Sequence, residues 1–137
     1  MKPIAAALSL VLIATGAQAQ SAREKYELSV QCGKQAAATF AKEWGSVPGG
    51  YNSEVKASAN YENHYNSRLN KCFYLETSNF SAVNNMSLWD LNENKEYGRY
   101  IIASAAEGPV TVQCYVEKRD CKTEDEFRAL IKQFMED

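Results

Sequence analysis

The sequence predicts an α+β domain with a long N-terminal helix, an antiparallel sheet of about five strands and a short C-terminal helix. Two observations support this fold class. Each end of the expected domain carries a helix-capping pattern followed by apolar residues at helical spacing, and the region between them is polar, asparagine-rich and interrupted by turn residues. Helices that flank a run of short strands favour an antiparallel meander over alternating strand–helix units.

An export signal precedes this domain. Lys2, an apolar run from Ile4 to Ala14 and the small residues up to Ala19 follow the order of a secretory signal peptide. The apolar run is shorter than the roughly 20 residues that a membrane-spanning helix needs. We therefore predict a signal peptide over residues 1–19 and a single domain over residues 20–137, located in the periplasm or secreted.

The charge of the chain narrows the choice of partner. The formal net charge is −2, and loss of Lys2 with the signal peptide makes it −3. Proteins that bind nucleic acid concentrate Lys and Arg, so we expect no nucleic-acid partner. No cysteine follows the cleavage site directly, so we expect no membrane anchor. Another protein is the expected partner.

Four cysteines predict disulfide bonds, because export places them in an oxidising compartment. Four cysteines allow three pairings, and we favour Cys32–Cys72 and Cys114–Cys121. Zinc binding is the alternative, but the spacings contain no C-x-x-C pair. We expect neither a metal nor another cofactor.

Capping boxes mark the start of both helices. Ser21 with Glu24 predicts a helix over about residues 22–44, and Thr123 with Glu126 predicts a helix to the C-terminus. Apolar residues spaced by three and four form one face of the long helix: Tyr26, Val30, Gly33, Ala37, Phe40, Ala41 and Trp44. The short helix has its own stripe: Phe127, Leu130, Ile131 and Phe134.

The middle of the chain predicts five strands: Lys56–Tyr65, Lys71–Ser78, Ser87–Leu91, Tyr97–Ser104 and Val110–Glu117. In the last strand, alternation places Val110, Val112, Cys114 and Val116 on one face. In the second strand Phe73 and Leu75 share a face, which leaves Cys72 on the other and conflicts with its pairing to the long helix. A sheet after a long helix could wrap that helix, as in cystatin-like folds, which is an analogy of architecture only.

The chain's single histidine lies in the segment Asn63–Leu75. One hypothesis makes His64 a general base that is oriented by Tyr61, Tyr65 or Glu62. In this hypothesis Arg68 holds an anion. The alternative, which we favour, is a histidine hydrogen-bonded in place at an asparagine-rich turn. A nucleophile, a base and an orienting group cannot all be identified in one stretch, and no hydrolase or phosphate-loop motif is present.

Carboxylates and tyrosines are two further groups of candidate functional residues. Carboxylates that could form a glycosidase pair are Glu62, Glu76, Asp90, Glu93 and Glu96; we expect these to be solvated surface residues. Tyrosines in or near the strands could cover a half-exposed sheet or form an interface: Tyr51, Tyr61, Tyr65, Tyr74, Tyr97, Tyr100 and Tyr115.

Three segments, HYNSRLNKCF, EYG and CKTEDEF, resemble those of small exported bacterial proteins of uncharacterised function. The resemblance covers most of the domain and implies no activity, cofactor or catalytic residue. In size, export and disulfide content the chain also resembles periplasmic inhibitors and immunity proteins.

These observations predict a non-enzymatic binding or accessory module, inhibitor-like or immunity-like, in the bacterial envelope. We expect it to contact another protein through a tyrosine-bearing sheet face, with Tyr61, His64, Tyr65 and Arg68 as candidate contact residues. The alternatives are a small hydrolase-like enzyme centred on His64 and a carrier of a small apolar ligand, which needs an apolar cavity between helix and sheet.

Overall fold

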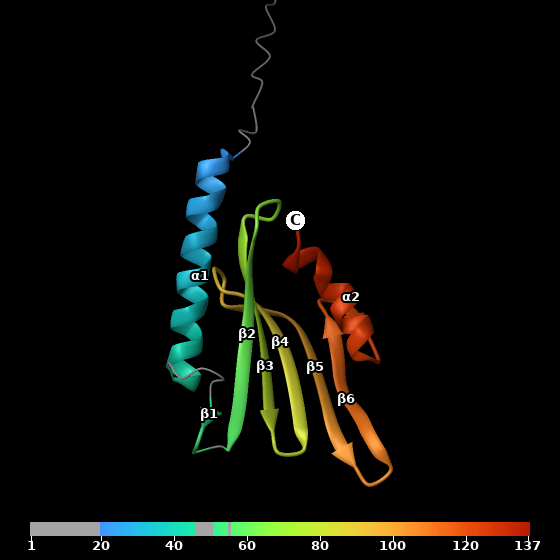
Figure 1. The fold of residues 1–137 in the computed structure, drawn as a ribbon. Helices are drawn as coiled ribbons and strands as arrows, with labels where there is room; N and C mark the ends of the chain where they lie inside the picture. Colours follow the sequence, from blue (N-terminus) through green and yellow to red (C-terminus); the bar gives the residue numbers. More distant parts are fainter. Residues whose placement is uncertain (1–19, 46–50, 55) are drawn as a thin grey trace, which may run out of the picture.

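The computed structural model describes residues 20–45, 51–54 and 56–137. It shows an α+β fold in which seven antiparallel strands form one sheet in sequence order (Figure 1). The predicted signal peptide lies outside the described residues. The elements are α1 (Ala22–Trp44), β1 (Tyr51–Asn52), β2 (Ala57–Asn66), β3 (Lys71–Phe80), β4 (Val83–Asp90), β5 (Lys95–Ala105), β6 (Gly108–Val116), β7 (Arg119–Asp120) and α2 (Glu124–Met135).

The five predicted strands overlap β2 through β6, although the predicted Ser87–Leu91 covers only the second half of β4. In the described residues the sheet has seven strands. The two additional strands, β1 and β7, have two residues each and pair with β2 and β6 at the edges of the sheet. Strands this short leave no alternation pattern to detect in a sequence. Both helices start at their predicted caps, since the hydroxyls of Ser21 and Thr123 accept hydrogen bonds from the backbone N–H of Glu24 and Glu126.

The two helices pack on opposite faces of the sheet. On β3, Cys72 and Tyr74 face α1, whereas Phe73 and Leu75 belong to the core under α2. This arrangement removes the apparent conflict over Cys72, because each face of β3 has its own helix to contact. The expected wrapping of the sheet around the long helix is not confirmed, since the sheet forms the middle layer and α1 packs mainly on β2 and β3.

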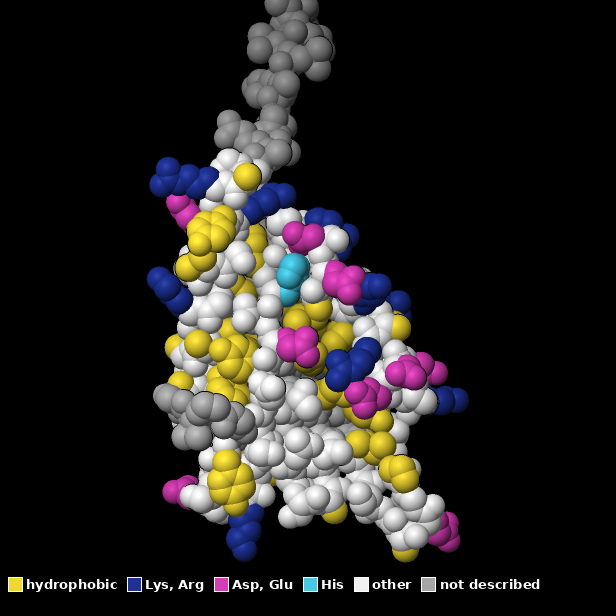
Figure 2. Space-filling view, viewed as in Figure 1, with side chains coloured by type: hydrophobic (Ala, Val, Ile, Leu, Met, Phe, Trp, Pro, Cys, Tyr) yellow, Lys and Arg dark blue, Asp and Glu magenta, His cyan; other side chains and the backbone are white. Residues whose placement is uncertain are grey.

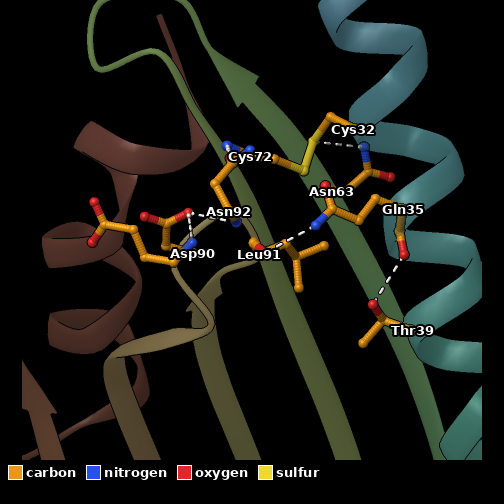
Figure 3. Close-up of a disulfide and its surroundings, with 9 residues drawn as sticks. Cys32, Gln35, Thr39, Asn63, Cys72, Asp90, Leu91 and Asn92 are labelled. Carbon is orange, nitrogen blue, oxygen red and sulfur yellow. Dashed lines mark hydrogen bonds between the residues drawn. A yellow bond between two sulfur atoms is a disulfide. The ribbon is translucent and has the colours of Figure 1, made fainter.

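Both predicted disulfides are present. Cys32–Cys72 joins α1 to β3, and Cys114–Cys121 joins β6 to the segment before α2. Figure 3 shows the first bridge beside the turn that follows β4. There the Gln35 side chain donates to the Leu91 carbonyl over 2.9 Å, which ties α1 to the turn at a second point.

Asp90 holds this turn in place. Its side chain is fully buried and accepts hydrogen bonds from the Lys71 ammonium, at 2.5 Å, and from the backbone N–H of Asn92, at 2.9 Å. Asn92 in turn accepts the backbone N–H of Cys72 over 2.7 Å. The bridge, the turn and the start of β3 are therefore one hydrogen-bonded unit.

The buried face of α1 agrees with the predicted stripe at Phe40 and Trp44 but differs from it in the first half of the helix. The buried residues follow every fourth position, at Cys32, Ala36, Phe40 and Trp44. Tyr26 and Val30, both assigned to the predicted face, are 70% and 39% exposed. The bridge to Cys72 explains the difference, because it turns the side of the helix that carries Cys32 toward the sheet.

The alternation predicted for the last strand holds only in part. Cys114 and Val116 are buried on the α2 face, but Val110 and Val112 are 54% and 63% exposed. The pairing of β5 with β6 shifts register between Ile101 and Ile102, so that Thr111, not Val112, lies opposite Ile102. Such a bulge inserts one extra residue and exchanges the two faces beyond it.

Gly98 supplies a test of how closely α2 is packed. A methyl group there would lie 2.9 Å from the carbonyl oxygen of Tyr115 and 3.3 Å from the ring of Phe127. We expect Gly98→Ala to lower the free energy of unfolding by about 1–3 kcal/mol, the usual cost of overpacking. Chemical denaturation measures it.

The control is Gly33→Ala within α1, where the added methyl group would meet only Asn63, at 3.9 Å. It should raise stability by about 0.5–1 kcal/mol, because alanine restricts the unfolded chain and favours the helix. Equal effects of the two substitutions would contradict the close approach of α2 to β5.

Candidate functional site

The segment around His64 binds the C-terminal end of α2. The amide of buried Asn66 lies 3.0–3.3 Å from the carbonyl oxygens of Gln133, Phe134 and Glu136, to which it donates. Arg68 donates to the Gln133 carbonyl as well, over 3.1 Å. The last carbonyls of a helix have no partner within the helix, so these side chains satisfy them and fix α2 to the β2–β3 hairpin.

His64 lies at the surface of this junction, where Figure 2 shows the histidine among acidic side chains. Its Nε2 is 3.2 Å from Oδ1 of Asp137. Ser67 donates to the same carboxylate through its backbone N–H, at 3.0 Å, and its hydroxyl, at 3.1 Å. The hydrogen bond from the Ser67 backbone, followed by that from His64, lowers the pKa of the Asp137 carboxyl. These contacts are compatible with a structural role for the histidine.

The other predicted contact residues point to the opposite face. Tyr61 packs against Phe40 and Tyr74, with ring centroids 4.8 and 5.4 Å apart. Tyr65 is buried, and its hydroxyl donates to Oδ1 of Asn70 over 2.6 Å. The structure therefore brings His64 and Arg68 together near α2 but places Tyr61 and Tyr65 beneath α1, so the four residues do not share one surface.

A second candidate lies on the face that carries α1. Because α1 packs on β2 and β3, no helix of the described chain covers β4, β5 and β6 on this side (Figure 1). We call this surface the open half of the sheet. Cross-strand pairing gives its side chains: Asn85, Ser87, Trp89, Glu96, Arg99, Ile101, Ala103, Val110, Gln113 and Tyr115.

A groove of about 230 Å³ separates α1 from the open half. Its centre is a cross-strand row in which Ser87 lies between Glu76 on β3 and Arg99 on β5. The small serine between two long side chains leaves the hollow. Other residues that line it include Glu43, Tyr74, Asn85 and Trp89.

A glutamate such as Glu76 is unusual at a partly buried position in the wall of a groove. Burial, assisted by the nearby Glu43 carboxylate, raises the pKa of Glu76 above its ordinary value. Hydrogen bonding opposes this: the Tyr74 hydroxyl donates to Glu76 over 3.1 Å, and the Trp44 indole lies close by. The Trp44 N–H makes no hydrogen bond of ordinary geometry with the described residues. No cation pairs with this carboxylate in the described chain.

The pKa of Glu96, on the same face of the sheet, shifts in the opposite direction. Burial favours the neutral form of Glu96, but hydrogen bonds from Arg99 and Tyr115 outweigh it and lower the pKa of Glu96. The Arg99 Nε is 3.1 Å from both carboxylate oxygens of Glu96, and the Tyr115 hydroxyl donates to one of them. Arg99 is therefore committed to Glu96 and leaves Glu76 without a counter-ion.

Sequence reasoning did not single out this groove. The sequence predicts solvated carboxylates at Glu76, Asp90 and Glu96, whereas Glu76 and Glu96 are partly buried and Asp90 is fully buried. One indication was available, since alternation on β3 puts Glu76 on the face of Cys72 and Tyr74, opposite Phe73 and Leu75. The position of α1 over only part of that face has no counterpart in the local sequence.

Comparison with known proteins finds no match to a family model, to a curated protein or to a solved structure. Within residues 20–45, 51–54 and 56–137, no helix has the length and apolarity needed to cross a membrane. In the same residues, no three His, Cys, Asp or Glu side chains are grouped so that they could hold a metal ion. Geometry alone therefore supports the candidate sites.

The contribution of the hydrogen bonds between Asn66 and the end of α2 can be tested with Asn66→Ala. Loss of the amide leaves buried carbonyl groups unsatisfied, which costs about 1–3 kcal/mol of unfolding free energy. His64→Ala is the control, because its contact with Asp137 is partly exposed and such pairs contribute about 0–1 kcal/mol. Denaturant titration of both variants compares them, and a larger loss for His64→Ala would contradict the structural role assigned to Asn66.

The raised pKa of Glu76 predicts how the stability of the protein depends on pH. Because its pKa is raised in the fold, the folded protein keeps a proton that the unfolded chain has released, so the contribution of Glu76 to stability falls as pH rises through this range. We expect Glu76→Gln to melt at a higher temperature than wild type at neutral pH, with the difference closing in acid. Glu62→Gln, at an exposed position on the other face, is the control and should leave the melting temperature unchanged. A lower melting temperature for Glu76→Gln at neutral pH would show that the carboxylate is stabilised.

Proposed function

We propose that this protein is an exported binding module without catalytic activity, which contacts a partner protein in the bacterial envelope through the open half of its sheet. An inhibitor-like or immunity-like role is the form of this function that we favour. The signal-peptide pattern supports export, and two disulfides suit an oxidising compartment.

The observation that carries the proposal is the uneven covering of the sheet. One face has α2 packed against β2, β5 and β6, whereas the other has α1 over β2 and β3. The open half presents Trp89, Arg99 and Tyr115, each only partly exposed and therefore held in place by its neighbours. Trp, Tyr and Arg are the residues most enriched among those that dominate the binding energy of protein interfaces.

The open half also offers a mixture of surfaces that suits protein contact. Ile101 is partly buried and Val110 is 54% exposed on the same face. Polar Gln113 lies opposite Ile101. An apolar centre with polar groups around it is the usual anatomy of a protein–protein interface.

The alternatives receive less support from the geometry. In the hydrolase hypothesis the imidazole must lie between a hydroxyl and a carboxylate, whereas here Asp137 lies between His64 and Ser67. A carrier of an apolar ligand needs a cavity between α1 and the sheet, where Phe40, Trp44 and other aromatic side chains pack instead.

The test compares two valine-to-arginine substitutions at exposed positions. Val110→Arg changes the open half, and Val30→Arg changes the outer side of α1. Partners of the mature, oxidised protein are captured from its own envelope, identified by mass spectrometry and purified for calorimetry. We expect Val110→Arg to weaken binding of the purified partner by at least about tenfold, a change of 1.4 kcal/mol.

Val30→Arg should bind the partner as wild type does. Both variants should keep the wild-type melting temperature, because both valines are exposed. Unchanged affinity of Val110→Arg together with weakened binding by Val30→Arg would move the contact surface to α1 and overturn the proposal.

A further inference from the structure

We infer that the groove beside Glu76 receives the charged end of a lysine or arginine side chain carried by the partner protein. The inference rests on the proposed function, because it names the chemistry that the open half recognises at this point. Three properties of the groove lead to it: its charge, its hydrogen-bonding groups and its size.

The groove carries more negative charge than its own side chains neutralise. Glu43 and Glu76 line the side formed by α1 and β3, and neither has an ion-pair partner in the described part of the chain. Arg99 lines the opposite side, but its guanidinium is bound to Glu96. An incoming cation would therefore meet two carboxylates that have no counter-ion in the described chain, one of them half-buried, where charges attract more strongly than in water.

The remaining groups on the groove wall also match a cation. The ring of Trp89 forms part of the wall. Ammonium and guanidinium groups donate hydrogen bonds and accept none. They also bind the faces of tryptophan rings. A carboxylate or phosphate ligand would instead meet like charge.

The size of the groove favours a side chain over a free small molecule. Its volume of about 230 Å³ falls below the ~300–1,000 Å³ of pockets that bind drug-sized ligands. A lysine or arginine can lay its alkyl stem along the partly exposed Trp89 and place its charge at Glu76. The negative net charge of the protein would also steer a basic partner toward it.

The surroundings of Glu76 predict how binding depends on pH. The titratable or charged groups that face it from the packed elements are Tyr74 on β3, Tyr61 on β2, Glu43 on α1 and Arg99 on β5. The only cation among them is already paired, so a bound ammonium group competes with a proton for the Glu76 carboxylate. Affinity for the cation should rise as pH rises through the raised pKa of Glu76.

The experiment uses the mature, oxidised protein with ¹⁵N labelling. Nα-acetyl-lysine methylamide and Nα-acetyl-arginine methylamide are the probes, and Nα-acetyl-norleucine methylamide is the uncharged control of similar length. We expect both cationic probes to shift the Trp89 indole and Ser87 amide resonances in a saturable way. Glu76→Gln should weaken the binding of the lysine probe by about tenfold or more, as expected for loss of a hydrogen bond to a charged group.

Glu62→Gln on the other face of the sheet is the matched control and should bind the probes as wild type does. Because Glu76→Gln is expected to melt at a higher temperature, its loss of binding would not reflect unfolding. Equal shifts from the norleucine probe, or equal affinity of wild type and Glu76→Gln for lysine, would overturn the inference.

The two proposals fail in different ways. If Val110→Arg weakens partner binding but the lysine probe does not bind, the open half is the contact surface and the cation site is wrong. If the lysine probe binds through Glu76 but partner capture does not depend on the open half, the proposed function fails while the groove keeps its affinity for a basic side chain.

Discussion

The disulfide between Cys32 and Cys72 is the constraint on which the rest of the structure depends. It joins residues 40 positions apart, and closing a loop of that length removes roughly 4 kcal/mol of chain entropy from the unfolded state. Its effect on geometry is as important, because the bond and the neighbouring contact of Gln35 with Leu91 set both the rotation of α1 and its position over β2 and β3. A helix held there cannot also cover β4 to β6, so the groove follows from where the bridge lies.

Two glutamates on that face show how neighbouring side chains determine the pKa of a partly buried carboxyl group. Glu96 and Glu76 are both partly withdrawn from water, yet their pKa values move in opposite directions because only Glu96 has an arginine and a second donor beside it. A partly buried carboxylate without a counter-ion in the described chain is an exception to the usual pairing of buried charges, and such exceptions are more frequent at functional sites. This contrast links the packing of α1 to the chemistry proposed for the groove.

The features that could be predicted from the sequence are those set by residues close together in the chain. Capping by Ser21 and Thr123, the bounds of α1 and the presence of strands in the middle of the chain follow from local pattern. The even number of cysteines predicts two disulfides, but counting leaves three pairings open. The sequence did not predict the bulge beside Val112, which depends on the pairing of β5 with β6. It also did not predict that the two faces of β3 contact different helices, or that Asn66 binds the end of α2. Glu76 could be placed on the face of Tyr74 by alternation, but its lack of a counter-ion depends on Arg99, which is distant in the chain and committed elsewhere.

The outer edge of β6 illustrates how the fold limits unwanted association. Among the described residues, β7 pairs with β6 at Tyr115 and Val116 only. The rest of β6, with two exposed valines, is therefore an edge in the described sheet to which another chain could add a strand. Pro109 has no N–H to offer there, and the bulge interrupts the regular spacing of donors and acceptors. Natural sheets use both devices against edge-to-edge aggregation. The irregularity that moves the valines away from simple alternation is thus also a feature of the kind that opposes strand addition at a sheet edge.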